Sequence, residues 1–224
     1  MRNKHFEFVE GDTITTGPGR TLKRIRALAA IATLGIVPGD VGGYVESDAN
    51  LSGDAWVSGD ARVYGDARVY GDARVSGDAL VSGNAQVYGD AWVSGDARVY
   101  GDALVYGNAR VSGNAQVYGN AQVYGDARVY GDALVSGNAR VSGDARVSGN
   151  DSILVVGPAK SSGRYTTAHK DEKLGVLVNC GCFSGSVLEF SKAIEDSHKN
   201  NKAHLEQYRL FCQLISFNFD VEAK

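Results

Sequence analysis

A six-residue repeat fills about half of the chain and limits the folds that the chain can adopt. Starting at Val45, every sixth residue through position 153 is Val, except for Leu51 and Ile153. Ala stands two residues before almost all of these positions, Gly two residues after them, and Asp or Asn three residues after them. No insertion interrupts the run, so the pattern keeps one phase over its whole length.

Each letter of the repeat has a structural reason. In Ala-x-Val, the two apolar residues lie on one face of a short strand because side chains alternate with period 2. Gly accepts positive φ, and Asp or Asn hydrogen-bonds to nearby backbone, so these two residues form a turn. A β-sandwich needs longer strands, with turns about every 8 to 12 residues. The sequence therefore predicts a solenoid with Ala and Val inside.

The repeat resembles the hexapeptide repeat of left-handed parallel β-helix proteins. That resemblance implies three repeats per triangular coil of about 18 residues, and therefore about six coils here. The left-handed winding is implied by the resemblance alone, because the general rule for crossover connections favours the right hand. We expect an all-β solenoid, with both open ends covered by other structure.

The chain divides into three zones. Residues 43–153 form the predicted β-helix, residues 1–42 an N-terminal β cap, and residues 154–224 a C-terminal α+β cap. In the N-terminal cap, residues 6–9 and 20–28 are expected to pair as strands, although the second stretch could also begin a helix that runs through Ile31. In the C-terminal cap, residues 164–170 and 173–179 are expected to form a hairpin.

Two helices are predicted after this hairpin. The first begins at a capping-box pattern, Ser186-Val-Leu-Glu189. The second covers about residues 202–216, and its apolar face carries Leu205, Tyr208, Cys212 and Ile215.

Segments outside the repeat extend the resemblance to hexapeptide-repeat proteins of phage and prophage genomes. They are residues 24–28 (RIRAL), 39–46 (GDVGGYVE) and 180–185 (CGCFSG). The resemblance implies a viral or prophage origin and no defined chemistry. A protein of this kind is expected to bind a host factor, including a component of a defence system.

Residues 18 apart are expected to stack on one face of the solenoid. One column after the Val position contains four consecutive tyrosines, Tyr70, Tyr88, Tyr106 and Tyr124. Tyrosine offers a stiff, amphipathic contact surface, so the column is a candidate binding surface. The alternative is that stacked aromatic rings stabilise exposed strands and do nothing else.

A second column, at the position between Ala and Val, begins with alternating Trp and Arg and ends with three consecutive Arg residues. It contains Trp56, Arg74, Trp92, Arg110, Arg128 and Arg146. Arg74 is expected to lie between two indoles in a cation–π stack. The last three arginines repel one another unless Asp126 and Asp144, or a bound anion, offset their charge. The column is therefore a candidate site for a small anionic ligand or acidic partner, and a solvent-screened ladder is the alternative.

Hexapeptide-repeat acyltransferases are the alternative functional class. They use a histidine general base beside the coils, whereas His5, His169, His198 and His204 all lie outside this repeat. A base within reach of the coils is therefore missing unless His169 folds back onto them. We expect a non-enzymatic protein without a cofactor.

Metal binding has weak support in the sequence. Cys180 and Cys182, with His169 or His198, form a possible zinc set, but paired Cys-x-x-Cys motifs are absent. Structural cysteines are the alternative. The turn positions of the repeat explain its Asp and Asn residues without calcium.

Charge and hydropathy restrict the partners. A formal charge of −3 gives no reason to expect general nucleic-acid or membrane binding. Residues 27–37 are mostly apolar but too short to cross a bilayer. Three cysteines fit a reducing compartment, so the expected location is cytoplasmic, in the host cytoplasm if a phage encodes the chain.

Self-association is also expected. Flat solenoid faces and closed symmetry favour a homotrimer ahead of a homodimer. The contact would involve either the tyrosine column or the C-terminal helices. The expected function is to present a rigid, repetitive surface to a partner, most simply a host protein.

Overall fold

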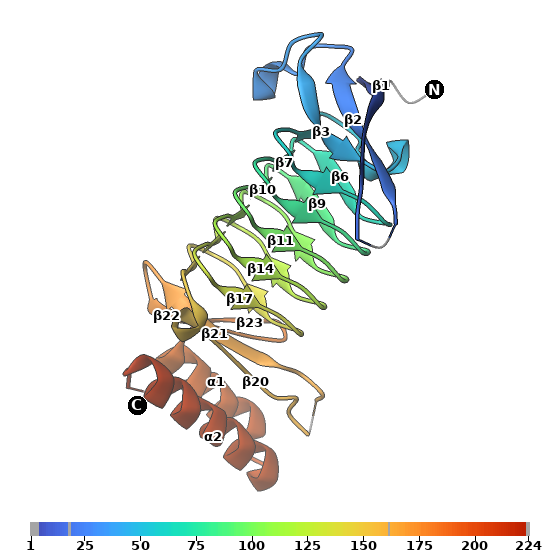
Figure 1. The fold of residues 1–224 in the computed structure, drawn as a ribbon. Helices are drawn as coiled ribbons and strands as arrows, with labels where there is room; N and C mark the ends of the chain where they lie inside the picture. The colour runs from blue at the N-terminus through green and yellow to red at the C-terminus, as the bar shows by residue number, and fades with distance from the viewer. Residues whose placement is uncertain (1–4, 18, 161, 223–224) are drawn as a thin grey trace.

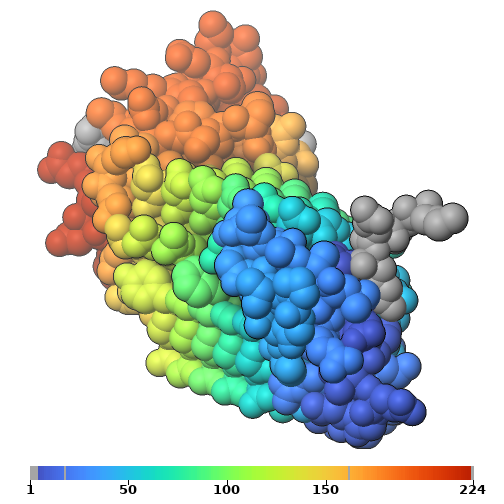
Figure 2. Space-filling view, turned by 90° about the horizontal axis from the view of Figure 1, so that it is seen from above, coloured from blue at the N-terminus to red at the C-terminus, as the bar shows by residue number. Residues whose placement is uncertain are grey.

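The protein is a parallel β-solenoid of about six turns, with an antiparallel sheet at its N-terminal end and helices at its C-terminal end (Figure 1). The computed structural model describes residues 5–17, 19–160 and 162–222. Figure 2 shows the regular rows of the coils between the two non-repetitive ends. The predicted fold class is therefore confirmed, whereas the left-handed winding stays an expectation from the resemblance.

Three sheets form the faces of the solenoid, and each coil contributes one strand to each sheet, except that the first coil contributes only the isolated bridge between Leu51 and Val69 to the third. The first face contains β3 (Val41–Val45), β5 (Arg62–Val63), β8 (Leu80–Val81), β11 (Arg98–Val99), β14 (Gln116–Val117) and β17 (Leu134–Val135). The second, called the arginine face, contains β4 (Trp56–Val57), β7 (Arg74–Val75), β10 (Trp92–Val93), β13 (Arg110–Val111), β16 (Arg128–Val129) and β19 (Arg146–Val147). The third, called the tyrosine face, contains β6 (Arg68–Gly71), β9 (Gln86–Gly89), β12 (Leu104–Val105), β15 (Gln122–Val123) and β18 (Arg140–Val141).

The core is built from the two small apolar residues of each repeat. Every repeat Ala from Ala55 to Ala145 and every repeat Val from Val45 to Val147 is fully buried. Strands pair in parallel with partners 18 residues away, as Val99 does with Val81 and Val117. Identical residues therefore stack on identical residues, which confirms the predicted inward face.

Repeat glycines form the corners and lie directly over the glycines of the next coil. Gly95 has φ +68°, and a Cβ there would lie 3.0 Å from the backbone nitrogen of Gly113. Gly137, near the end of the solenoid, has φ +63° but no heavy atom within 4 Å of such a Cβ. Gly95 and Gly137 therefore share the left-handed backbone conformation, but only Gly95 lies against the backbone of the next coil.

We expect Gly95→Ala to destabilise the protein more than Gly137→Ala. Both variants force a side chain into the left-handed region, which costs about 1–2 kcal/mol. Only Gly95→Ala also pushes against the backbone of the next coil, so its unfolding free energy should fall by roughly 1 kcal/mol more. Urea denaturation of the two variants measures the difference, and equal losses would show that close corner stacking does not constrain the repeat.

The N-terminal cap is an antiparallel extension of the first face. β1 (Phe6–Thr15) pairs with β2 (Thr21–Ala27), and β2 pairs with β3. The expected pairing of two strands is confirmed, but β1 is longer than residues 6–9, and the alternative helix through Ile31 is wrong. Short 3₁₀ segments follow at η1 (Ala32–Leu34) and η2 (Asp48–Asn50).

The C-terminal cap is a four-stranded antiparallel sheet backed by two helices (Figure 1). It contains η3 (Asn150–Ser152), β20 (Ile153–Val156), β21 (Thr166–Asp171), β22 (Gly175–Cys180), β23 (Phe183–Ser186), α1 (Val187–His198) and α2 (Lys202–Phe219). The β21–β22 hairpin and the capping box at Ser186 and Glu189 are as expected, and the predicted apolar face of α2 is buried. β20 and β23 were not expected. None of the helices in the described part of the chain is long and apolar enough to cross a membrane.

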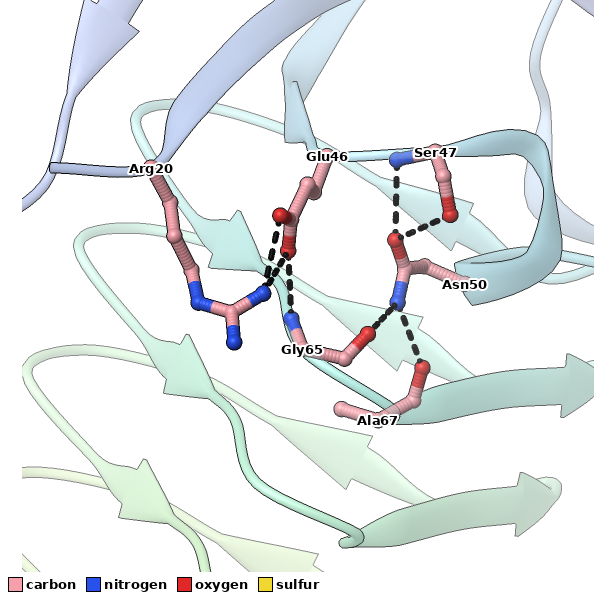
Figure 3. A network of polar contacts seen from close by, with 6 residues as sticks. All are labelled: Arg20, Glu46, Ser47, Asn50, Gly65 and Ala67. Atoms are coloured by element: carbon pink, nitrogen blue, oxygen red, sulfur yellow. Dashed lines mark hydrogen bonds and ion pairs between the residues drawn. The ribbon is translucent and has the colours of Figure 1, made fainter. Parts of the chain in front are cut away.

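Parallel stacking gives the solenoid a polarity. Backbone N–H groups of one coil donate to carbonyls of the next, as Trp56 does to Ala73 at 3.0 Å. At the N-terminal end no complete coil comes before, and side chains of the N-terminal region donate to carbonyls there. Asn50 Nδ2 donates to the carbonyl of Ala67 at 2.8 Å (Figure 3), and Arg24 Nη1 donates to that of Gly59 at 3.0 Å.

The last coil has the opposite requirement, because its N–H groups face outward. Side-chain acceptors of the C-terminal region meet them. Asn150 Oδ1 accepts from Leu134 N at 3.0 Å, and Thr167 Oγ1 accepts from Arg140 N at 3.0 Å. Each cap thus provides the type of hydrogen-bonding group that its end of the solenoid lacks.

Candidate functional site

Four stacked tyrosines form a continuous ladder on the tyrosine face. Their ring centroids lie 4.8, 5.0 and 5.1 Å apart from Tyr70 to Tyr124, and adjacent planes differ by no more than 5°. These spacings are close to the distance between neighbouring strands, about 4.8 Å, because each ring stands on its own strand. The structure therefore brings together all four tyrosines of the predicted column.

The four tyrosines of the ladder are half-buried. Burial, and next the neighbouring phenols, raise the pKa of Tyr70 and Tyr106. Tyr70 also donates its hydroxyl proton to Gln86 Oε1 at 3.1 Å, which fixes the first ring. The surface offers aromatic ring edges beside hydroxyl groups, with little freedom for the side chains to lose on binding.

The other faces carry fewer stacked rings. Tyr100 and Tyr118 stack at 4.9 Å on the first face, where Ser82 and Ser136 occupy the neighbouring positions of the column. Only the ladder on the tyrosine face extends over four rungs within the described residues.

The arginine face differs from its prediction at the N-terminal end. Trp56 is only 4% exposed, so it belongs to the core and offers no surface to a ligand. Arg74 pairs in register with both Trp56 and Trp92, but its guanidinium donates to the carbonyl of Thr33 at 2.8 Å. The cation–π contact of this column is instead Arg110 over Trp92, at 5.7 Å.

Arg110, Arg128 and Arg146 occupy successive rungs, as the repeat predicts. Arg146 forms an ion pair with Glu172, from the turn between β21 and β22. The C-terminal cap thus supplies one carboxylate that offsets this row of positive charge. Arg110 also lines a small pocket of about 270 Å³, which η1 partly covers.

The histidines all lie in the caps. His169 folds back onto the last coil, but it is completely buried, and its Nε2 lies 3.2 Å from Asn179 Nδ2. Its imidazole is closed to a substrate in this conformation. His5 contacts the carbonyl of Ala55, and His198 stacks on Tyr208 at 5.1 Å beside His204.

The possible zinc set is not assembled. Cys180 is buried and Cys182 is exposed, while His169 and His198 have the separate partners described above. Within the described ranges, no cluster of three or more His, Cys, Asp or Glu side chains could hold a metal ion. Burial raises the pKa of the Cys212 thiol to about 11, as expected for a structural cysteine.

One polar pocket was missed by the sequence analysis. It lies between the tyrosine face and the C-terminal cap and contains Arg140 and Arg164. Arg164 stands outside the repeat, so no column argument could place it beside Arg140.

Comparison with known proteins supports the same architecture. A family model described as YdcK Beta solenoid repeat matches residues 55–71, 61–75, 67–83, 73–89, 85–101, 97–113, 103–119, 121–137 and 139–151. A search of curated proteins found no match. The repeat segment is therefore similar to these β-solenoid repeats, and the chain is a β-helix repeat protein.

Proposed function

We propose that the protein is a non-enzymatic binding or scaffold protein whose tyrosine ladder contacts a protein partner. The ladder carries the proposal, because four parallel rings at regular spacing form one long, preorganised strip. Tyrosine is enriched at interface positions that contribute most to binding.

The backbone beneath the ladder favours this role. Each inner strand of the tyrosine face is held by parallel hydrogen bonds to both neighbours, as β12 is to β9 and β15. A partner that binds rigid side chains on a rigid backbone loses less conformational entropy than one that binds a mobile loop. Its surface should be extended and should offer apolar groups together with hydrogen-bonding groups.

The resemblance to phage and prophage proteins favours a host protein as this partner. A component of a defence system is one such partner. A second or third copy of the chain is the other occupant that a flat face suits. Variants of the ladder test a foreign partner and a self-contact through the ladder together, whereas self-association through the C-terminal helices would not respond to them.

The alternative class, a hexapeptide-repeat acyltransferase, has less support. It needs a histidine that reaches a substrate beside the coils. His169 is the histidine nearest to meeting that requirement, and it is buried against Ser142 and Asn179.

Replacement of two central rungs tests the proposal. We expect Tyr88→Ser with Tyr106→Ser to weaken partner binding at least about tenfold, because Ser occupies this position in many repeats and keeps the fold. Tyr64→Ser with Tyr130→Ser is the matched control, since it makes the same changes at the same repeat position outside the ladder.

Two measurements separate the possible occupants. Light scattering gives the oligomeric state of the wild type and both variants. Capture from bacterial host lysate, followed by titration of the identified protein, gives the affinity for a foreign partner. If both variants bind and assemble like the wild type, the ladder only stabilises the strands and the proposal is wrong.

A further inference from the structure

A polar pocket lies where the tyrosine face meets the C-terminal cap, separate from the ring stack of the ladder. It has a volume of about 290 Å³. The coils contribute Asn120, Gln122, Asn138 and Arg140, and the cap contributes Arg164 and Gly181. Four of these six residues are exposed, and Gln122 and Gly181 are half-buried. The pocket is therefore open to solvent.

Gly181 brings the two arginines together. Its carbonyl accepts a hydrogen bond from Arg140 Nη1 at 2.9 Å. A Cβ at Gly181 would lie 3.0 Å from both Cδ and Nη1 of Arg164, so that side chain passes directly over the glycine. With φ +62°, Gly181 also has a backbone conformation that other residues adopt at a cost. Two guanidinium groups therefore converge on one turn.

No carboxylate neutralises this pair of cations in the part of the chain that the structure describes. Arg146 and Arg209, also in or beside the C-terminal cap, have carboxylate partners in Glu172 and Glu195. The guanidinium of Arg140 is held by a neutral carbonyl instead. Two cations beside each other leave a site whose charge favours an anion.

The asparagines of the pocket are also exceptional within the repeat. Elsewhere an Asn corner donates to the Asp one coil later, in the pairs Asn84 with Asp102, Asn108 with Asp126, and Asn114 with Asp132. Asn120 is followed one coil later by Asn138, so no carboxylate lies at that position. These corners present neutral amides, which can donate to a ligand, where Asp would repel an anion.

We propose that this pocket binds an oxyanion, a carboxylate or phosphate group, between the guanidinium groups of Arg140 and Arg164. Guanidinium groups donate paired hydrogen bonds to such groups, and the amides of Asn120, Gln122 and Asn138 can supply further donors. Backbone contacts preorganise Arg140, because its N–H donates to Thr167 Oγ1 and its carbonyl accepts from Asn179 Nδ2. The proposal does not depend on a partner at the tyrosine ladder.

Titration of the full chain with small anions tests the pocket. Inorganic phosphate and succinate are added separately at constant ionic strength, with chloride as the reference. The amide signals of Gly163 and Gly181, which both line the pocket, are followed by NMR. We expect a saturable shift with at least one of the two anions. Arg140→Gln and Arg164→Gln should each weaken that binding at least about tenfold.

Arg68→Gln is the matched control. Arg68 occupies the same position of the tyrosine face as Arg140, four coils earlier, and Gln occurs naturally in this column at Gln86 and Gln122. The control removes the same charge away from the pocket, and it should bind like the wild type. Thermal unfolding of the three variants confirms that each is folded.

The outcomes are distinct. Saturation by phosphate alone identifies a phosphate site, saturation by succinate alone identifies a carboxylate site, and saturation by both supports a general oxyanion site. The proposal is overturned if neither anion saturates the signals with a Kd below about 50 mM. It is also overturned if Arg68→Gln weakens binding as much as the pocket variants do.

Discussion

Val99→Asp is expected to abolish folding of the solenoid rather than to weaken it slightly. Val99 is completely buried in β11, between the equivalent valines of the coils before and after it. A carboxylate there would have no partner, and burial of an unpaired charge costs several kcal/mol, comparable to the whole stability of many domains. The variant should lack the cooperative thermal unfolding that circular dichroism detects in the wild type.

Two further variants separate charge burial from the general effect of substitution. Arg98→Asp places the same carboxylate on the neighbouring exposed residue, and it should change the unfolding free energy by less than about 1 kcal/mol. Val99→Thr keeps the shape but buries a hydroxyl, with an expected loss of about 1–3 kcal/mol. A Val99→Asp protein that melts at the wild-type temperature would contradict the inward assignment.

The repeat could be predicted well because its local chemistry and its packing agree. Ala, Val and Gly each have one role per repeat, and an 18-residue coil then fixes which residues stack. The 18-residue period predicts Tyr88 between Tyr70 and Tyr106, and the structure has these rings in parallel stacks. Because no insertion interrupts the six-residue repeat, each strand can pair with its neighbours in only one register.

The caps could be predicted only in outline, because their contacts join residues far apart in the sequence. The phase of the repeat places Trp56 outward, but residues of the N-terminal sheet cover its ring, which lies close to Gly42. Residues 180–185 contain two glycines and no strand pattern, yet pairing with β22 makes Phe183–Ser186 a strand.

The candidate binding features differ in the same way as the repeat and the caps. The ladder lies within one column and could be predicted from spacing alone. The pocket at Arg140 could not, since it needs Arg164 and Gly181 from a cap whose docking the repeat does not determine. A useful signal was present in the sequence, because Asn120 and Asn138 are successive Asn corners in a column that elsewhere includes Asp.

His169 is a buried polar residue of the C-terminal cap that contacts the last coil. Its Nε2 faces two donors, Ser142 N at 3.5 Å and Asn179 Nδ2 at 3.2 Å. Its Nδ1 lies 3.3 Å from the carbonyl of Lys170, so the partners assign the proton to Nδ1 and the acceptor role to Nε2. His169→Leu should lower the unfolding free energy by about 2–4 kcal/mol, because buried donors lose their acceptor. His169→Gln, which retains an acceptor oxygen, should lose less.

The same contacts predict a dependence on pH. Burial lowers the pKa of His169 below its ordinary value, although the Lys170 carbonyl and the charge of Asp171 act in the opposite direction. The unfolded chain therefore binds this proton more readily than the folded protein does. The stabilisation is fully present above about pH 6.5 and is lost as the pH falls toward the folded-state pKa.

Urea denaturation at pH 7.5 and pH 5 measures this effect. The wild type should lose more stability than His169→Leu on acidification, so the difference between the two proteins should narrow. A difference that stays constant between the two pH values would show that protonation of His169 does not loosen the cap. Narrowing of the difference would identify the neutral imidazole as the acceptor that holds this cap on the last coil.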